Sequence, residues 1–174
     1  LTNQPRQATV RSGADGALLW RAAGDGPWDR FGTSIGVLDD VTGDGIADVV
    51  AGAWEDDVDL NGDGVLGILE SHVGMLRVFS GADGGEVYTL YGTASRMGFG
   101  HSVAGIDDVD GDGIGDLVVG ATDTLTNFDT DRVFVLSGVD GSTIHQIVAA
   151  TTTDHLGQRV ARTFDHDGDG VGAV

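Results

Sequence analysis

The chain has 174 residues, which is about the length of one domain and enough to bury a hydrophobic core. Its formal net charge is −19 and all nine basic residues are Arg, so it lacks the clustered cations that contacts with nucleic-acid phosphates require. The absence of Cys excludes disulfide bonds and thiol chemistry, and no run of 18 apolar residues predicts membrane insertion.

The acidic residues are almost all Asp. Of the 28 Asp and Glu residues, only Glu55, Glu70 and Glu86 are Glu. A general acidic surface would use both types, whereas the short Asp side chain is favoured where a carboxylate folds back on its own loop. The composition therefore indicates acidic turns or cation-binding loops.

The chain contains an internal repeat with two signatures. The first reads FGTSIGVLDDVTGDGIAD from Phe31, FGHSVAGIDDVDGDGIGD from Phe99 and LGQRVARTFDHDGDGVGA from Leu156, with offsets of 99 − 31 = 68 and 156 − 99 = 57 residues. The second reads SGADG at Ser12, SGADG at Ser80 and SGVDG at Ser137, with the same two offsets. Chance similarity does not produce matched spacing, so the chain is a series of related units.

Each unit is predicted to hold four short strands, because apolar runs and alternating β-branched residues recur between Gly- and Asp-rich turns. No segment has a helical period. In chain order, the expected strands lie at 8–12, 17–21, 33–38, 48–53, 75–80, 86–91, 101–106, 116–121, 132–137, 143–148 and 158–164. The sequence therefore predicts an all-β fold made of β-propeller blades of four antiparallel strands.

These strands divide the chain into four parts. Residues 1–30 supply the third and fourth strands of a blade, residues 31–98 and 99–155 are full blades, and residues 156–174 begin a further blade. About three blades' worth of strands is fewer than the four or more that a closed ring needs. We expect the chain to be part of a larger six- or seven-bladed propeller. The other blades would lie in the same protein or in a second copy that exchanges strands. A third possibility is that the chain is one part of a protein within a larger complex.

The repeat resembles FG-GAP repeats, on the Phe-Gly pairs at Phe31 and Phe99, the Asp-rich loops and the strands VAGA and VVGA. This family forms the seven-bladed propeller of integrin α-subunits and occurs in secreted bacterial proteins. The resemblance implies Ca²⁺ bound in the loop between strands one and two. The chain departs from the pattern at Trp54 and Thr122, where the family has Pro after Gly-Ala.

The acidic loops have the spacing of calcium loops, in which alternate side chains and one backbone carbonyl supply oxygen ligands. The carbonyls of Ile46 and Ile114 stand at the seventh position, and Gly45 and Gly113 permit the turn. We expect one Ca²⁺ in each of two loops, with these side-chain ligands: Asp40, Thr42, Asp44 and Asp48 in the first, and Asp108, Asp110, Asp112 and Asp116 in the second.

Two further calcium sites are expected. The first blade contains an insertion, DLNGDGVLGILE at 59–70, that fits the EF-hand loop pattern without the flanking helices. Its ligands would be Asp59, Asn61, Asp63, the Val65 carbonyl and Glu70; the alternative is a solvated acidic insertion. The third repeat loop offers Asp165, Asp167 and Asp169 but has Ala173 at the ninth position, so it either binds calcium weakly or has lost its cation.

In the family that the chain resembles, partners bind the face opposite the calcium loops. Trp, Tyr and Arg are the residue types that anchor interfaces, and aromatic side chains also stack on sugars. Here that face would carry Trp28, Arg30, Trp54, Tyr91, Arg96 and Phe128. We predict a protein-binding or adhesion module, with a carbohydrate-binding propeller or a non-catalytic part of a polysaccharide-degrading enzyme as the alternative. Both Trp residues could instead serve only to cover the edge of the core.

No catalytic activity is predicted. The five His residues are scattered, and the sequence has no HExxH motif, no Ser-centred elbow and no phosphate-binding loop. If the parent protein were an enzyme, a polysaccharide lyase or hydrolase would fit the resemblance. Calcium loops of extracellular modules often bind weakly, which is useful only where calcium is plentiful. We therefore expect an extracellular, cell-surface or periplasmic protein.

Overall fold

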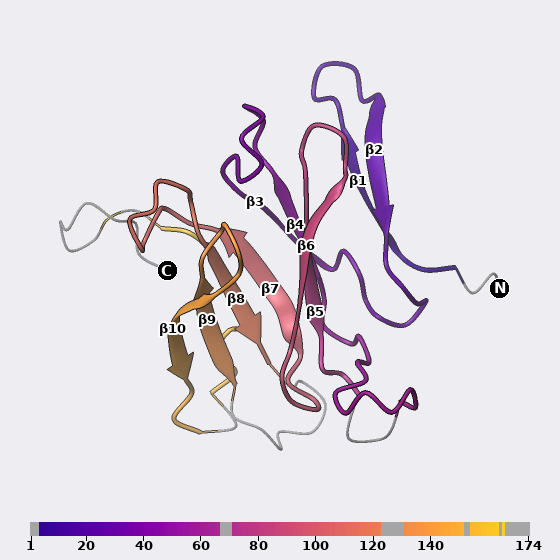
Figure 1. Cartoon of the computed structure of the whole chain (residues 1–174), viewed down its shortest axis with the longest axis vertical. Helices are drawn as coiled ribbons and strands as arrows, with labels where there is room; N and C mark the ends of the chain where they lie inside the picture. Colours follow the sequence, from indigo (N-terminus) through magenta and orange to yellow (C-terminus); the bar gives the residue numbers. More distant parts are fainter. Residues whose placement is uncertain (1–3, 67–70, 123–130, 152–153, 164, 166–174) are drawn as a thin grey trace.

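The computed structural model describes residues 4–66, 71–122, 131–151, 154–163 and 165. Within these ranges the chain is all-β and forms three antiparallel sheets, arranged side by side in Figure 1. The first is a hairpin of β1 (Gln7–Arg11) and β2 (Leu18–Ala23). The other two are four-stranded meanders, as expected for propeller blades.

The second sheet has the order β3-β4-β5-β6 and the third has the order β7-β8-β9-β10. Every neighbouring pair follows directly in the sequence, which is the connectivity of a blade. The strands are β3 (Ser34–Val37), β4 (Val49–Ala53), β5 (Met75–Phe79) and β6 (Glu86–Tyr91), then β7 (Phe99–Gly105), β8 (Leu117–Ala121), β9 (Arg132–Leu136) and β10 (Thr143–Val148).

The core lies between the sheets. Strands β5 and β8 are buried at every residue, because both faces of each blade pack against another layer. The main cluster joins Val50 and Leu76 of the second sheet to Leu117 and Val119 of the third. A second cluster joins the β1–β2 hairpin to the second sheet, with Trp20 against Phe79. The three sheets therefore stack face to face.

The glycines of the repeat bring neighbouring blades together. A Cβ atom on Gly52 of β4 would lie 2.1 Å from the Gly100 carbonyl oxygen, and one on Gly120 of β8 would lie 1.9 Å from that of Gly157. The Ser34 hydroxyl donates to the Gly100 carbonyl at 2.7 Å, and the Ser102 hydroxyl donates to the Gly157 carbonyl at 2.7 Å. The start of each repeat is thus locked onto the preceding blade.

Two strand predictions need correction. Strand β7 begins at Phe99, two residues before the expected start at His101. No strand forms over the described part of the expected strand at 158–164. A strand requires a hydrogen-bonded neighbour, and the segment that would pair with it, 171–174, lies outside the described residues. Residues Leu156 and Val160 instead pack on the outer face of the third sheet.

Candidate calcium loops and the opposite face

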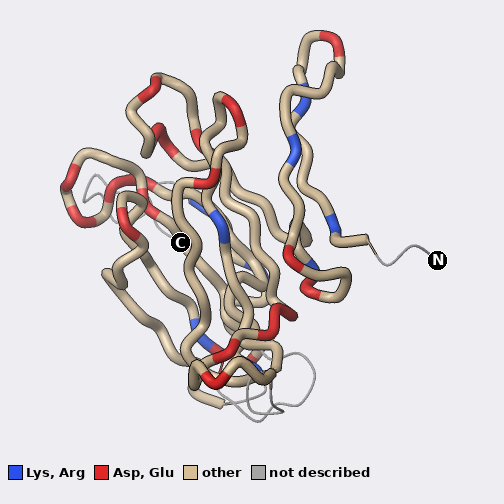
Figure 2. Tube along the Cα trace, turned by 45° about the vertical axis from the view of Figure 1, so that its right-hand side comes forward, with Lys and Arg blue, Asp and Glu red and all other residues tan. Residues whose placement is uncertain are grey.

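Acidic residues gather in the loops at the two ends of the strands, as Figure 2 shows in red. One end carries the loops between the first two strands of each blade. In the loop at 108–116, the Asp108 carboxylate accepts hydrogen bonds from the amides of Gly111 at 2.6 Å and Gly113 at 2.8 Å. Both glycines have positive φ angles, of 84° and 92°. The turn therefore wraps around Asp108, as expected for a residue at the first position of a calcium loop.

Asp116 closes the loop from its far end. This residue is completely buried, and its two carboxylate oxygens accept hydrogen bonds from the Val109 amide at 2.7 Å and the Gly138 amide at 3.0 Å. Gly138 belongs to the second repeat signature, SGVDG. A single buried carboxylate thus ties the acidic loop to the turn between β9 and β10, 22 residues further along the chain.

Three carboxylates of this loop converge. One oxygen each of Asp108, Asp110 and Asp116 lies within 4.8 Å of the other two, and among the described residues no other group of three acidic or His side chains does so. Desolvation and the neighbouring charges of Asp116, Asp112 and Asp108 raise the pKa of Asp110. Asp112 accepts a hydrogen bond from the Ile114 amide at 2.8 Å and is not in the group. The group is suited to hold a small divalent cation.

The loop at 40–48 has the same turn, and a buried Asp likewise joins it to the turn between the third and fourth strands of its blade. Asp40 accepts from the amides of Gly43 at 2.7 Å and Gly45 at 2.6 Å, and these bonds lower its pKa. Asp48 is completely buried and accepts from the Val41, Thr42 and Gly81 amides. Thr42 replaces the carboxylate at the third position, and its hydroxyl donates to Asp40 at 3.2 Å. This loop therefore brings fewer charges together than its counterpart.

The remaining expected ligands of this loop are Asp44 and Ile46. Asp44 accepts a hydrogen bond from the Ile46 amide at 2.8 Å, and the Ser80 hydroxyl lies 3.3 Å from its other oxygen. The side chain of Ile46 is exposed. The pair Asp112 and Ile114 repeats the first of these contacts.

The described part of the insertion, 59–66, forms the same turn. Asp59 accepts from the amides of Gly62 and Gly64, both at 2.7 Å, and Asp63 accepts from the Val65 amide at 2.8 Å. Asn61 accepts from the Asp63 amide at 2.8 Å. The expected closing ligand, Glu70, lies outside the described residues. In the third repeat loop, Asp165 is exposed, and Asp167 and Asp169 also lie outside them.

The residues expected on the opposite face lie in different places, and of those described only the two Trp residues line one or other of two cavities. Trp54 contacts His101 in a tilted arrangement, with ring centroids 5.2 Å apart, in a groove of about 830 Å³, and Trp28 lines a second pocket of about 280 Å³. Arg30 lies beside the second pocket and donates to Glu55 at 2.8 Å. Tyr91 and Arg96 line neither cavity, and Phe128 lies outside the described residues.

The groove contains one buried imidazole. The Nδ1 atom of His101 has no hydrogen-bond partner among the described residues, and burial lowers the pKa of this His. His101 is therefore neutral at physiological pH, with a nitrogen free to accept or donate a hydrogen bond. Ser34, Ser102 and Arg159 line the same groove. No paired spacing in the sequence singles out His101.

The smaller pocket holds the residue that sequence reasoning missed. Asp56 is buried, with 8% of its surface exposed, and no hydrogen bond to its carboxylate is formed among the described residues. Burial, with Asp25, Asp29 and Asp57 nearby, raises its pKa to about 7. The only sequence signal was the run Glu55-Asp56-Asp57, which follows a buried strand.

Comparison with known proteins finds no family model that matches the chain. Integrin alpha-X from Homo sapiens is 33% identical over 113 residues, and integrin alpha-X from Mus musculus is 33% identical over 103 residues. These matches cover 60% and 55% of this chain but only 8% of either relative. The integrin likeness agrees in part with the resemblance to FG-GAP repeats and is too short to assign the family.

Solved structures with a similar fold are lyases. The chain matches rhamnogalacturonan lyase YesW with a TM-score of 0.54 at 19% identity, over 95% of this chain and 32% of that one. A rhamnogalacturonan lyase from Bacillus licheniformis matches with a TM-score of 0.53 at 18% identity, over 95% and 32%. The chain thus spans about a third of these enzymes, and the likeness concerns the fold.

These neighbours correct one prediction. The sequence predicts no catalytic activity, and that prediction is corrected, because the fold of this chain is found within enzymes. No helix of the described residues is long and apolar enough to cross a membrane.

Proposed function

We propose that the chain is a calcium-stabilised segment of a β-propeller in an extracellular protein, and that the face opposite the calcium loops binds a partner. The observation that carries the proposal is the convergence of Asp108, Asp110 and Asp116 within 4.8 Å. Like charges at this distance repel unless a cation lies among them. Ca²⁺ suits the site because it takes six to eight oxygen ligands, partly from backbone carbonyls.

The proposed calcium ions act on the structure by joining elements. In each blade the acidic loop connects the two inner strands, and the buried Asp48 or Asp116 connects that loop to the third and fourth strands. A cation held by the same loop would therefore stiffen all four strands. We assign one ion to each of the loops at 40–48 and 108–116, a third to the insertion at 59–70 and a fourth, weaker one to 165–173.

The test is thermal unfolding with calcium and with a chelator. Calcium should raise the melting temperature, and Asp110→Asn should reduce that rise, because the amide keeps the size of the side chain but removes one ligand charge. Asp140→Asn is the matched control, since Asp140 is an exposed turn residue of the same blade that only accepts from the Ser142 amide. An equal calcium response in wild type and Asp110→Asn would refute the assignment at this loop.

The other blades of the ring would come from the rest of the protein or from a second copy. Light scattering distinguishes these sources. A calcium-dependent dimer would support closure by strand exchange, in which the β1–β2 hairpin of one copy completes the blade begun at 156–174 of another. A monomer in calcium would favour closure within a longer protein.

A second candidate function is carbohydrate binding within a polysaccharide-degrading enzyme. The groove of about 830 Å³, with Trp54 and the neutral His101, supports it, because aromatic rings stack on sugars and a neutral imidazole can take up a proton. Rhamnogalacturonan is the first polymer to test, given the names of the structural neighbours. Binding that is lost in Trp54→Ala and kept in the exposed His145→Gln control would support this function, and product release lost in His101→Gln would add catalysis.

A further inference from the structure

The smaller pocket on the face opposite the calcium loops is built from two connections. The link between β2 and β3 contributes Asp25, Trp28 and Asp29, and the segment after β4 contributes Glu55, Asp56 and Asp57. The cavity measures about 280 Å³, close to the lower limit of small-molecule sites. Five carboxylates and one indole ring thus line a space larger than a single ion needs.

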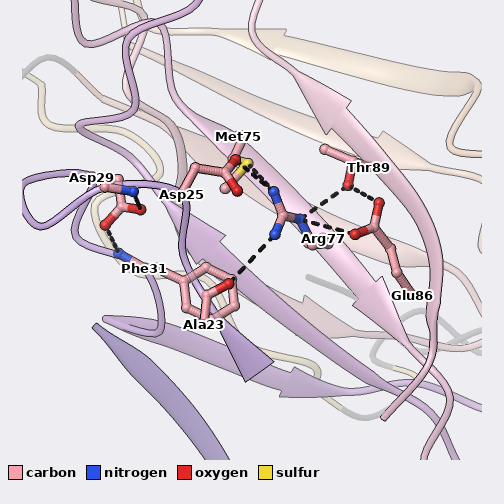
Figure 3. A network of polar contacts seen from close by, with 9 residues as sticks. Ala23, Asp25, Asp29, Phe31, Met75, Arg77, Glu86 and Thr89 are labelled. Carbon is pink, nitrogen blue, oxygen red and sulfur yellow. Dashed lines mark hydrogen bonds and ion pairs between the residues drawn. The ribbon is translucent and has the colours of Figure 1, made fainter. Parts of the chain in front are cut away.

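Four of the five carboxylates have partners in the protein. Glu55 pairs with Arg30, and Figure 3 shows the Asp25 carboxylate beside Arg77, whose Nη2 donates to it at 2.7 Å. The other two accept backbone hydrogen bonds: Asp29 from Gly26 and Phe31, and Asp57 from His72.

Asp56 is the exception. It is more than nine-tenths buried and lines the pocket, and its carboxylate accepts no hydrogen bond from the described residues. The pocket therefore holds five acidic side chains against the two Arg residues that pair with them. A buried carboxylate without a partner is costly, and a cationic ligand would relieve that cost.

Trp28 provides an apolar surface at the same pocket. Its side chain is 74% exposed, whereas Trp20 is buried in the core. An exposed indole face attracts cations through its quadrupole and also packs against the flat face of a sugar ring. Trp28 thus combines with the carboxylates to favour a ligand that has both a positive charge and a ring.

A bare divalent cation fits the pocket less well. Its carboxylates do not form a group like that of Asp108, Asp110 and Asp116, in which oxygens of three residues lie within 4.8 Å of one another. Wider spacing suits an ammonium group, which is held through hydrogen bonds rather than direct coordination. The size of the cavity, about 280 Å³, leaves room for the ring that carries the ammonium group.

We propose that this pocket binds an amino-sugar unit of a glycan, with the primary ammonium group of the sugar on Asp56 and the sugar ring against Trp28. The proposal rests on the binding role of this face and names the chemical class of its ligand. An acidic surface of this kind repels anionic polymers and attracts a glycan that carries free amines.

The test compares two ligands with the same sugar rings, one with charged amino groups and one with neutral acetylated ones. The glucosamine trimer with free amines and the fully N-acetylated trimer are titrated by calorimetry at pH 7.0, where Asp56 is about half ionised, at a fixed saturating calcium concentration. We expect the free-amine trimer to bind at least about tenfold more tightly, because one charge-assisted hydrogen bond contributes that much. Equal binding of the two trimers, or no binding of either, would overturn the proposal.

Two variants locate the site. Asp56→Asn and Trp28→Ala should each weaken binding of the free-amine trimer about tenfold or more, and Asp83→Asn, an exposed turn residue, should leave it unchanged. Because Trp28 is exposed, its variant tests the site even if Asp56→Asn fails to fold. Unchanged affinity in Trp28→Ala would overturn the proposal. Tighter binding of Nα-acetyl-lysine methylamide than of the free-amine trimer would also overturn it and would assign the pocket to a protein partner. Calcium is constant throughout, so failure here is separate from failure of the calcium assignment.

Discussion

Asp116 and Asp56 are both buried carboxylates, at opposite ends of the molecule, and they differ in every other respect. Both oxygens of Asp116 accept backbone hydrogen bonds, whereas Asp56 has no such partner among the described residues. Desolvation is offset in the first case and raises the pKa of the second. The calcium-loop end therefore uses buried charge to hold strands together, and the opposite end keeps one buried charge available for a proton or a ligand.

The largest expected effect is at Asp116. Asp116→Asn should destabilise the protein by about 3–5 kcal/mol, because one hydrogen bond to a charged acceptor is lost and the new amide group faces a backbone N–H donor. Urea unfolding in chelator measures this effect apart from calcium. The exposed Asp140→Asn should change stability by less than about 0.5 kcal/mol. A loss below about 1 kcal/mol at Asp116 would contradict its role as a tie.

Asp56→Asn should have the opposite sign. With a pKa of about 7 in the folded protein and 3.8 in the unfolded chain, the folded state holds the proton longer. Wild-type stability therefore falls as pH rises from about 4 to 7, by at most about 4 kcal/mol at 1.4 kcal/mol per pH unit. The Asn variant does not suffer this loss.

Unfolding experiments at two pH values check this prediction. The variant should match wild type at pH 4 and exceed it by about 2–4 kcal/mol at pH 8. Asp83→Asn, an exposed turn substitution, should track wild type at both values. A variant less stable than wild type at pH 8 would mean that Asp56 is paired and ionised, which would remove the contrast with Asp116.

The sequence predicted the calcium-loop end better than the opposite end for a physical reason. At Asp40, Asp59 and Asp108 the turn depends on neighbours within five residues, so the Asp and Gly spacing is enough to predict it. The bond from Gly138 to Asp116 joins residues 22 apart and depends on the register of three strands. The equivalent residues of the other blade, Asp48 and Gly81, are 33 apart, so the sequence spacing does not predict the bond.

The opposite end could not be predicted in the same way. The pKa of Asp56 is raised because the residue is buried and the link between β2 and β3 brings Asp25 and Asp29 close to it. Nothing in the run Glu55-Asp56-Asp57 predicts that these segments come together. The environment of His101 depends likewise on Trp54 of the preceding blade. Both sites are made by contacts between blades, whereas a motif reports contacts within one loop.

A smaller effect is expected from exchanging the two blade loops. Thr42→Asp gives the loop at 40–48 the charge of the loop at 108–116, so the melting temperature should fall in chelator and rise further with calcium. The calcium response should grow by about 2–4 °C, which corresponds to about 1 kcal/mol for a protein of this size. Asp110→Thr is the reciprocal change and should reduce the response by a similar amount. A calcium response that Thr42→Asp leaves unchanged would mean that the third position supplies no ligand.

The smallest effect on stability is expected in the insertion. Asp59→Asn should change the free energy of unfolding in chelator by less than about 0.5 kcal/mol, because Asp59 only accepts from exposed backbone amides and no buried tie depends on it. The same variant should lose one bound calcium ion per chain in equilibrium dialysis, since Asp59 holds the first position of that loop. A full complement of calcium would show that the insertion is a solvated acidic loop. In that case the buried Asp48 and Asp116, which the described part of this loop does not match, would be the feature that turns an Asp-Gly turn into a calcium site.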